Sequence, residues 1–552
     1  MPRSSRSIGR TLGLLAAGLV LAAAAGAAAR PAGASSLIRQ GGDQERAAAL
    51  VAEGVAALEK GDEEGARNLF RRAAEADPTS EPAHTYLGVM ADRAGDLKEA
   101  ERHFATAAME APTSAPARNN HGAILLRLGR VEQAARQFEA SLRIDPRQPS
   151  ALVNLAQIRF EGGKPESLRT AFDLFERAYR IAPDGEIARA LVVTALRLDD
   201  RAAAARYFRQ YAASPPPQEG GAPSAASRYE LGAALLKAGM ADEAARELGA
   251  AVEAAPSDAE AVVLLGRAHL ARKDIPAAGR TLEGAVARGV DAAPVYLALA
   301  EVYTLSGHPE NAIPAMRLAV ERDPGNEFYR FRYAMMLTDT RAPQAAVIRL
   351  REALEKFPRS SRLWFALGVA QFTDRKVIDA ADAFRRALEF DPHFAPALAY
   401  LGMTYAEQGQ YTEAIPFYEQ AVAADEHLSP ARYLLADAML KQASSDAGRA
   451  EEHLTRAVAI DPTFVPAQLE LAKLLFRTNR AEEAARLLER LVAAKSDVAQ
   501  AHYQLGLVYG RLKRVADAKI AFENFKRLSD TQQQQSETER VEIVRRLADV
   551  RF

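Results

Sequence analysis

The sequence predicts an all-α protein in which helical hairpins stack side by side into an α-solenoid, a right-handed superhelix. Small and aromatic residues recur at fixed offsets, and prolines recur 34 residues apart, as at Pro78, Pro112 and Pro146. The chain has 552 residues, whereas single hydrophobic cores stop growing near ~250–300 residues. A fixed period in a long chain therefore favours a linear array over several unrelated domains.

Residues 361–394 show the period most clearly. Proline lacks an amide donor and clashes with the preceding turn, so the proline near the end of each period should stop the second helix. We expect Gly368 to face Ala380, because small side chains let two helices approach closely, and Phe384 to fill the space toward the next unit. The markers of this period are Trp364, Leu367, Gly368, Ala380, Phe384, Ala387 and Pro392.

These offsets resemble the tetratricopeptide repeat, a helix–turn–helix unit of 34 residues. About fourteen units fit between about Ala47 and about Asp530. The resemblance implies that first helices line a concave face, on which positions two, five, six, nine, twelve and thirteen of each unit meet a protein or peptide. Matching residues in the second, eighth and fourteenth units are Leu87, Gly88, Ala100, Phe104 and Pro112; Leu299, Ala300, Tyr303, Ala312 and Pro324; and Leu505, Gly506, Tyr509, Ala518 and Phe522.

A segment rich in proline and glycine, residues 214–224, interrupts the period. We expect units one to five over residues 47–213 and units six to fourteen over residues 225–530. The segment between them is either a hinge or a long surface loop within one superhelix, and both interpretations stay open.

Residues 531–552 begin with a glutamine-rich linker. Val541, Val544, Leu547 and Val550 then recur at a spacing of three, which predicts a helix with one apolar face. We expect a capping helix over the exposed end of the stack, with a partner-docking helix as the alternative.

Residues 1–34 have the layout of a secretory signal. Arg3, Arg6 and Arg10 precede the uncharged residues 11–29, and Ala32-Gly33-Ala34 fits a cleavage site. The alternative is an uncleaved anchor formed by residues 11–29. In either case we expect the folded part to be exported, periplasmic or associated with the outer envelope, and to meet a membrane only through this segment.

The composition and motifs argue against several classes of chemistry. The formal net charge of −1 gives no basic bias toward nucleic acid, and the absence of cysteine excludes disulfides and thiolate metal sites. We find no hydrolase, kinase, phosphate-loop or zinc motif in the sequence. We therefore expect no enzymatic activity, no cofactor and no metal.

Two sets of residues are candidates for partner binding on the concave face. Asn120 and Asn154 fall at position six of adjacent units and resemble an asparagine ladder that holds a peptide backbone; chance polar surface is the alternative. The second set, which we call the aromatic stripe, has the composition of a binding hot spot, and the alternative is that some members belong to the core. The aromatic stripe comprises Phe328, Phe331, Arg332, Met335, Arg362, Phe365, Phe372, Tyr400, Met403 and Tyr433.

The sequence therefore predicts an exported, non-enzymatic scaffold that binds a protein or peptide on its concave face. Two alternatives follow from the resemblance. One is a periplasmic component of an envelope-assembly or polysaccharide-export machine. The other is a regulatory arm that acts with an enzyme in trans. The sequence identifies neither the partner nor the oligomeric state.

Overall fold

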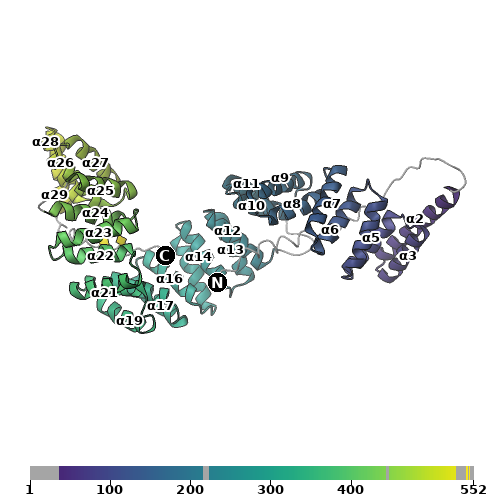
Figure 1. Ribbon diagram of the computed structural model, residues 1–552, viewed down its shortest axis with the longest axis horizontal. Coiled ribbons are helices and arrows are strands. Elements are labelled where there is room, and N and C mark those ends of the chain that lie inside the picture. Colours follow the sequence, from purple (N-terminus) through teal and green to yellow (C-terminus); the bar gives the residue numbers. More distant parts are fainter. Residues whose placement is uncertain (1–36, 215–222, 443–446, 530–541, 545, 548–552) are drawn as a thin grey trace. The chain divides into compact units, whose positions relative to one another are not determined.

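The computed structural model describes residues 37–214, 223–442, 447–529, 542–544 and 546–547. Within these ranges the chain forms helices joined by turns and contains no strand (Figure 1). The predicted all-α solenoid of helical hairpins is therefore confirmed. Residues 1–34, which carry the predicted export signal, lie outside the described residues. No helix in the described part of the chain is long and apolar enough to cross a membrane.

The described chain divides into two compact units, one ending at Val290 and one beginning at Asp291. Each contains seven hairpins. Those of the N-terminal unit are α2 (Leu37–Glu59) with α3 (Glu63–Ala76), α4 (Glu81–Arg93) with α5 (Leu97–Glu110), α6 (Ala115–Arg127) with α7 (Val131–Ile144), α8 (Pro149–Glu161) with α9 (Pro165–Ile181), α10 (Gly185–Arg197) with α11 (Arg201–Ala213), α12 (Ala225–Lys237) with α13 (Ala241–Ala254), and α14 (Ala259–Ala271) with α15 (Ile275–Ala287).

The hairpins of the C-terminal unit continue the same pattern, so the described residues hold fourteen hairpins, as the period predicts. They are α16 (Ala293–Leu305) with α17 (Pro309–Arg322), α18 (Glu327–Asp339) with α19 (Pro343–Lys356), α20 (Ser361–Thr373) with α21 (Val377–Phe390), α22 (Ala395–Ala406) with α23 (Tyr411–Ala424), α24 (Ser429–Lys441) with α25 (Ala447–Ile460), α26 (Val465–Arg477) with α27 (Ala481–Ala494), and α28 (Ala499–Arg511) with α29 (Val515–Ser529).

In six hairpins of the described chain an aromatic ring of the second helix lies against a glycine of the first helix, and in units six and seven a leucine takes the place of the ring. A Cβ atom on Gly88 would lie 2.8 Å from Cε1 of Phe104, and Gly402 and Tyr418 repeat this approach at 2.6 Å. The small residue of the first helix therefore faces the aromatic residue of the second helix. At Gly368 the atoms nearest to an added Cβ would be those of the Phe384 ring, while the predicted approach of Ala380 stays a prediction.

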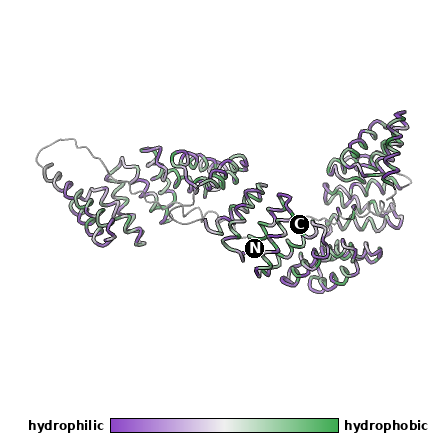
Figure 2. The backbone as a smooth tube through the Cα atoms, turned by 180° about the vertical axis from the view of Figure 1, so that it is seen from behind, coloured by the Kyte–Doolittle hydropathy of each residue, from purple (hydrophilic) through white to green (hydrophobic). Residues whose placement is uncertain are grey.

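The same ring also reaches the next hairpin. Phe70 of unit one stacks on Tyr86 of unit two with ring centroids 4.6 Å apart, and Phe384 stacks on Tyr400 at 5.2 Å. Each ring thus joins its own first helix to the following one, which couples nearest neighbours directly. Figure 2 shows hydrophobic and hydrophilic residues interleaved along the tube, as expected when every hairpin buries its own small part of the core.

The turn inside each hairpin has one residue in the left-handed region. In the described residues this holds for every unit except the twelfth, whose turn includes residues 443–446 outside the described part. Glycine adopts this conformation without strain, whereas other L-residues pay for it. The glycines are Gly61, Gly95, Gly129, Gly163, Gly239, Gly307 and Gly409, and the others are Asp199, Lys273, Arg341, Arg375, Asn479 and Lys513.

Aspartate shapes the turns between hairpins. The carboxylate of Asp77 accepts a hydrogen bond from the backbone N–H of Thr79 at 3.0 Å, and Asp145 accepts one from Arg147 at 2.9 Å. These bonds hold the turn that follows each second helix, next to the proline that prevents the helix from continuing.

The predicted break at residues 214–224 lies between α11 and α12, and residues 215–222 are outside the described part. On either side of it, the hydroxyl of Tyr211 in α11 donates to the carboxylate of Glu247 in α13 at 3.4 Å. The two helices are therefore in contact, and the choice between a hinge and a loop stays a prediction.

Most of the predicted C-terminal cap, residues 531–552, lies outside the described residues. Its described residues are Glu542, Ile543, Val544, Arg546 and Leu547, which we call the C-terminal turn. The hydrogen bonds from this turn reach units eleven and thirteen, on the side of the first helices. Whether the segment also covers the final hairpin stays a prediction. The distances are given below.

Candidate functional site

The first helices of units one to three line a cavity of about 930 Å³, which we call the N-terminal cavity. Its walls come from one face of α2, from α4 with the turn before it, and from the start of α6. A volume of this size is typical of sites that take a ligand. The lining residues are Gln44, Ala48, Val51, Ala52, Val55, Ala56, Glu59, Asp77, Thr79, Ser80, Glu81, Pro82, Thr85, Tyr86, Ser114, Pro116 and Asn120.

The lining follows the helical period. On α2 the lining residues recur at spacings of three and four, so a single stripe of the helix faces the cavity. Ala52, Tyr86 and Asn120 occupy position six of units one, two and three. The small side chain of Ala52 leaves room where the other two units carry larger groups. The positions that the resemblance assigned to the concave face do line a cavity in these three units.

Asn120 is one of the polar groups that the cavity holds without a side-chain hydrogen bond to a described residue. Its side chain is only 3% exposed, it lines the cavity, and it makes no side-chain hydrogen bond with any described residue. Asn154 differs, because its Nδ2 donates to Oδ1 of Asn119 at 3.2 Å in a buried pair. The two predicted ladder residues therefore have different surroundings, and only Asn120 faces the cavity.

The cavity is acidic. Glu59, Asp77 and Glu81 line it, and among its described lining residues there is no lysine, arginine or histidine. Burial raises the pKa of Glu81, while the hydrogen bond that Thr85 Oγ1 donates to it at 3.2 Å opposes the shift. Burial, followed by the nearby charge of Glu81, also raises the pKa of Tyr86.

Tyr86 forms the aromatic part of the wall. Its ring is parallel to that of Phe70, with an interplanar angle of 4°. The ring is half-buried, and its hydroxyl makes no hydrogen bond with the described residues. The side chain therefore presents a fixed edge and a free hydroxyl to whatever enters the cavity.

Most of the aromatic stripe is buried. This corrects the expectation that the stripe forms an open surface, while its role in binding stays a prediction. Phe328, Arg332 and Arg362 are half-buried, and Arg332 pairs with Glu301 at 3.5 Å. The members with at most 8% exposure are Phe331, Met335, Phe365, Phe372, Tyr400, Met403 and Tyr433.

The stripe is buried because its rings pack on one another from hairpin to hairpin. The centroid of Tyr400 lies 5.5 Å from that of Phe365 and 5.9 Å from that of Phe372, both edge to face. Tyr433 packs in the same way on Phe464 at 5.5 Å. These contacts form one continuous apolar cluster along the C-terminal unit.

The C-terminal turn contacts the first helices that carry the aromatic stripe. The hydroxyl of Tyr400 donates to the backbone carbonyl of Val544 at 2.8 Å, across 144 residues of sequence. Ile543 and Leu547 are 8% and 1% exposed and belong to the same apolar cluster. Arg546 pairs with Asp461.

Beyond the stripe, the first helices of units twelve and thirteen carry ion pairs. Asp437 pairs with Lys441 at 2.7 Å, and Glu470 pairs with Lys473 at 3.1 Å. Burial raises the pKa of Asp437, and the nearby ammonium group of Lys441 opposes that shift. These carboxylates are therefore paired with cations, whereas no ion pair with a described lysine or arginine is formed by the carboxylates of the N-terminal cavity.

Sequence reasoning missed the carboxylates of the N-terminal cavity. Glu59 falls at position thirteen, which the resemblance assigns to the concave face, so reading the charges at those positions would have found it, whereas Glu81 falls at position one, outside that set. No local signal pointed to the contact between Tyr400 and the C-terminal turn, because the partners are remote in the sequence.

No group of three described His, Asp or Glu side chains is placed to hold a metal ion.

Sequence profiles described as tetratricopeptide repeat match residues 57–124, 119–186, 235–302, 293–326, 339–395, 383–415, 405–446, 441–507 and 499–531. Together they cover most of the chain. The chain belongs to the tetratricopeptide repeat family. This fold is typical of scaffolds for protein–protein interaction. No curated protein matches the sequence.

Solved structures of other helical-repeat proteins resemble the tetratricopeptide array at low identity. The APC/C hetero-tetramer Cut9–Hcn1 is 15% identical with a TM-score of 0.35, and the match covers 80% of this chain and 99% of that one. Pseudomonas aeruginosa pilF is 23% identical with a TM-score of 0.34, covering 40% and 96%. Naa15/Naa10 bound to HypK-THB is 14% identical with a TM-score of 0.31, covering 91% and 80%.

Proposed function

We propose that this tetratricopeptide repeat protein is a non-enzymatic scaffold that acts outside the cytoplasm and holds a peptide segment of a partner protein in the N-terminal cavity. The observation that carries the proposal is Asn120. Its amide lines the cavity and makes no hydrogen bond with the described residues, so a peptide backbone that enters the cavity could supply both a donor and an acceptor.

The charge of the cavity defines the partner further. Three carboxylates without a balancing cation favour a segment that carries arginine or lysine and disfavour an acidic one. The exposed alanines of α2 and the ring of Tyr86 would contact the aliphatic part of such a side chain. The proposed ligand is therefore an extended peptide with at least one basic residue.

Titration with peptides tests both statements. Fluorescein-labelled octapeptide pools would share one randomised background and differ only in a fixed central residue: arginine, glutamine or glutamate. We expect the arginine pool to bind about tenfold or more tightly than the glutamate pool. Equal binding of all three pools would retain the peptide site and reject the charge argument, whereas no binding by any pool would contradict the proposed site.

Asn120 and Asn154 provide a matched pair of variants. Asn120→Ala should weaken arginine-pool binding by about tenfold, because one hydrogen bond to the ligand is lost, and should leave folding stability nearly unchanged. Asn154→Ala should leave binding unchanged and lower the free energy of unfolding by about 1 kcal/mol, because the Asn119 amide loses its partner. The opposite pattern would remove Asn120 from the site.

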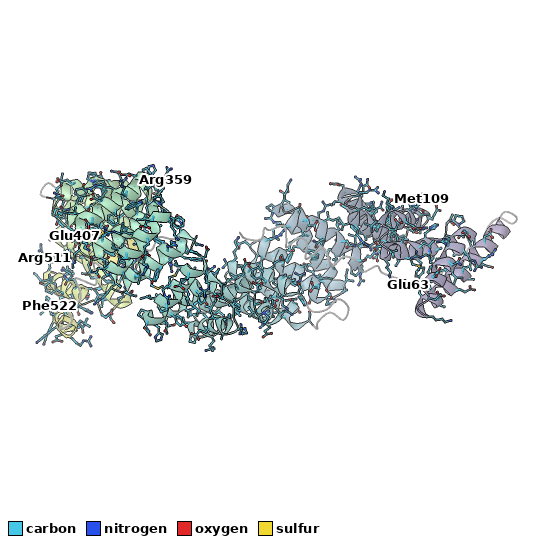
Figure 3. All side chains as sticks on the ribbon, turned by 90° about the horizontal axis from the view of Figure 1, so that it is seen from below. Glu63, Met109, Arg359, Glu407, Arg511 and Phe522 are labelled. Atoms are coloured by element: carbon cyan, nitrogen blue, oxygen red, sulfur yellow. The ribbon has the colours of Figure 1, made fainter. Side chains whose placement is uncertain are left out.

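Photo-crosslinking locates the contact in cells. A photoreactive residue at Ala52, on the cavity wall, should give protein adducts. The same residue at Met109 should not, because Met109 is 68% exposed on the second helix of unit two (Figure 3). Equal adducts at both positions would indicate non-specific contact.

Location is tested separately. Arg3, Arg6 and Arg10 followed by uncharged residues support export. The N-terminus of the protein purified from its own cells should begin near residue 35 if the segment is cleaved. Added protease should digest the folded array in cells whose outer barrier is opened, and protection of the array would contradict the proposed location.

A further inference from the structure

The first helices of units eleven to thirteen, with the turn before α26, form a surface that contacts the C-terminal turn of the same chain. The C-terminal turn inserts two apolar side chains, Ile543 and Leu547, which are four residues apart and therefore on one helical face. Tyr400 meets the backbone of this turn through the 2.8 Å hydrogen bond to Val544. Because that bond uses a carbonyl group, it is independent of the side chain at position 544.

Arg546 supplies the side-chain specificity of the contact. Its guanidinium pairs with the carboxylate of Asp461 and lies 5.0 Å from the ring centroid of Phe464. It also donates to the carbonyl oxygen and the hydroxyl of Thr463, each at 3.3 Å. One arginine thus engages a carboxylate, a backbone carbonyl and an aromatic face at the start of α26.

Arginine is enriched in binding hot spots, and here it stands beside two buried apolar side chains. The receiving side belongs to the repeat array itself. Tyr400, Tyr433 and Phe464 lie within the apolar cluster of the hairpins, and Asp461 is held in a turn by hydrogen bonds from Thr463. The wall is thus shaped by the array, and the turn is the ligand.

We propose that the inner wall of units eleven to thirteen is a helix-binding site that the chain fills in cis with its C-terminal turn. The partner that competes for it is a helix presenting two apolar side chains four residues apart, with an arginine immediately before the second. This site is distinct from the N-terminal cavity, so either proposal can fail without the other.

The test uses the full chain and a fluorescein-labelled synthetic peptide of residues 537–552. In the wild-type chain the tethered segment is present at a millimolar-scale effective concentration, so the free peptide should bind poorly. Arg546→Glu in the full chain places like charges at Asp461 and should release the turn. We expect the free peptide to bind this variant at least about tenfold more tightly than it binds the wild-type chain.

Two substituted peptides serve as controls. Peptides that carry Arg546→Glu or Leu547→Asp should bind the Arg546→Glu chain at least about tenfold more weakly than the native peptide. Equal binding of native and substituted peptides, or equal binding of the native peptide to both chains, would overturn the proposal. Absence of binding to the Arg546→Glu chain would also overturn it.

Two further measurements address the possibility of a contact between two copies of the chain and the case of an unfolded variant. Sedimentation should find the same oligomeric state for the wild-type and variant chains; a wild-type dimer that Arg546→Glu dissociates would assign the segment to a second copy and reject the cis contact. If circular dichroism shows the variant to be unfolded, hydrogen exchange on the wild-type chain decides. Excess unlabelled peptide should then speed exchange at residues 542–547, and unchanged exchange at saturating peptide would reject the proposal.

Discussion

The inner walls of the two compact units differ in how their polar and aromatic groups are satisfied. In the N-terminal unit, Asn120 and the hydroxyl of Tyr86 face a cavity and make no hydrogen bond with the described residues. In the C-terminal unit, Tyr400 is fully buried and bonded to Val544. Tyr86 and Tyr400 both occupy position six of their units. Equivalent positions in a repeat can therefore be open or filled, depending on what packs around them.

The largest expected difference concerns these two tyrosines. Tyr400→Ala should lower the free energy of unfolding of the C-terminal unit by about 3–5 kcal/mol, because it empties a site packed on all sides. Tyr86→Ala should cost about 1–2 kcal/mol, because the ring is half-buried and loses mainly its stacking on Phe70. Hydrogen exchange in each unit measures both values, and equal losses would contradict the contrast between an open and a filled wall.

The next effect tests how far damage spreads. Gly368→Leu should destabilise its hairpin by about 1–3 kcal/mol, because the ring of Phe384 occupies the space that the new side chain needs. Units one to five should keep their amide protection, because each hairpin contacts only its neighbours.

Gly249 on α13 gives the control for this substitution. No atom lies within 4 Å of its would-be Cβ, so Gly249→Leu should be neutral or stabilising by up to about 1 kcal/mol through helix propensity. A uniform loss of protection in both units of the Gly368→Leu chain would argue against nearest-neighbour coupling.

A smaller effect is expected in the pH dependence of peptide binding in the N-terminal cavity. Burial raises the pKa of Glu81, so this carboxyl becomes neutral at a higher pH than an exposed one as the pH falls. Binding of the arginine peptide pool should therefore weaken by about threefold or more between about pH 7 and about pH 5. Glu81→Gln should remove most of this dependence, and an unchanged pH profile would exclude Glu81 from the ligand contact.

The raised pKa of Glu81 also determines how this carboxyl changes the folding stability with pH. Because the folded-state pKa of Glu81 is raised, its contribution favours the folded state at a pH below the pKa of the unfolded chain. That contribution is lost as the pH rises through the folded-state pKa. Glu81→Gln should therefore not lower the stability at neutral pH. A marked loss would mean that the ionised carboxylate supports the fold.

The smallest expected changes in stability come from substitutions in the turns inside the hairpins. The first four hairpins have glycine at the left-handed position, whereas in the C-terminal unit Gly307 and Gly409 share this role with Arg341, Arg375, Asn479 and Lys513. Arg375→Gly should raise the free energy of unfolding by about 0.5–1 kcal/mol, because the strain of a side chain at φ of 63° is removed. Gly95→Ala should lower it by about 1 kcal/mol. Urea unfolding of both variants measures this, and changes of the opposite sign would contradict the assignment of strain.

The sequence predicted the hairpins well because their signals are local. Prolines, glycines and aromatic residues repeat within 34 residues, and the Asp-Pro turns confirm where second helices end. The nearest neighbour of Gly368 was missed: the residue was paired by size with Ala380, whereas the ring of Phe384 lies closest to it. Spacing alone does not show which of two nearby residues on the second helix points inward.

The site was predicted only in part. Asn120 was selected by its position and does line a cavity, but Asn154 was selected by the same rule and is bonded to Asn119. The aromatic stripe was chosen by composition, which does not distinguish a binding surface from a core. Its burial depends on contacts between successive hairpins and on the contact between Tyr400 and Val544, and no local pattern encodes such pairings.

The ring-on-glycine contact has a consequence for how the gene can change. The ring of Phe384 touches Gly368 behind it and Tyr400 of the next first helix ahead of it, so a hairpin of this kind offers the same two faces to whatever precedes and follows it. Duplicating or deleting one 34-residue segment in frame would recreate that junction at the new seam. The length of the array is therefore free to vary in evolution, while Asp461 and Phe464 at the start of α26 must keep their distance from the tail that reaches them.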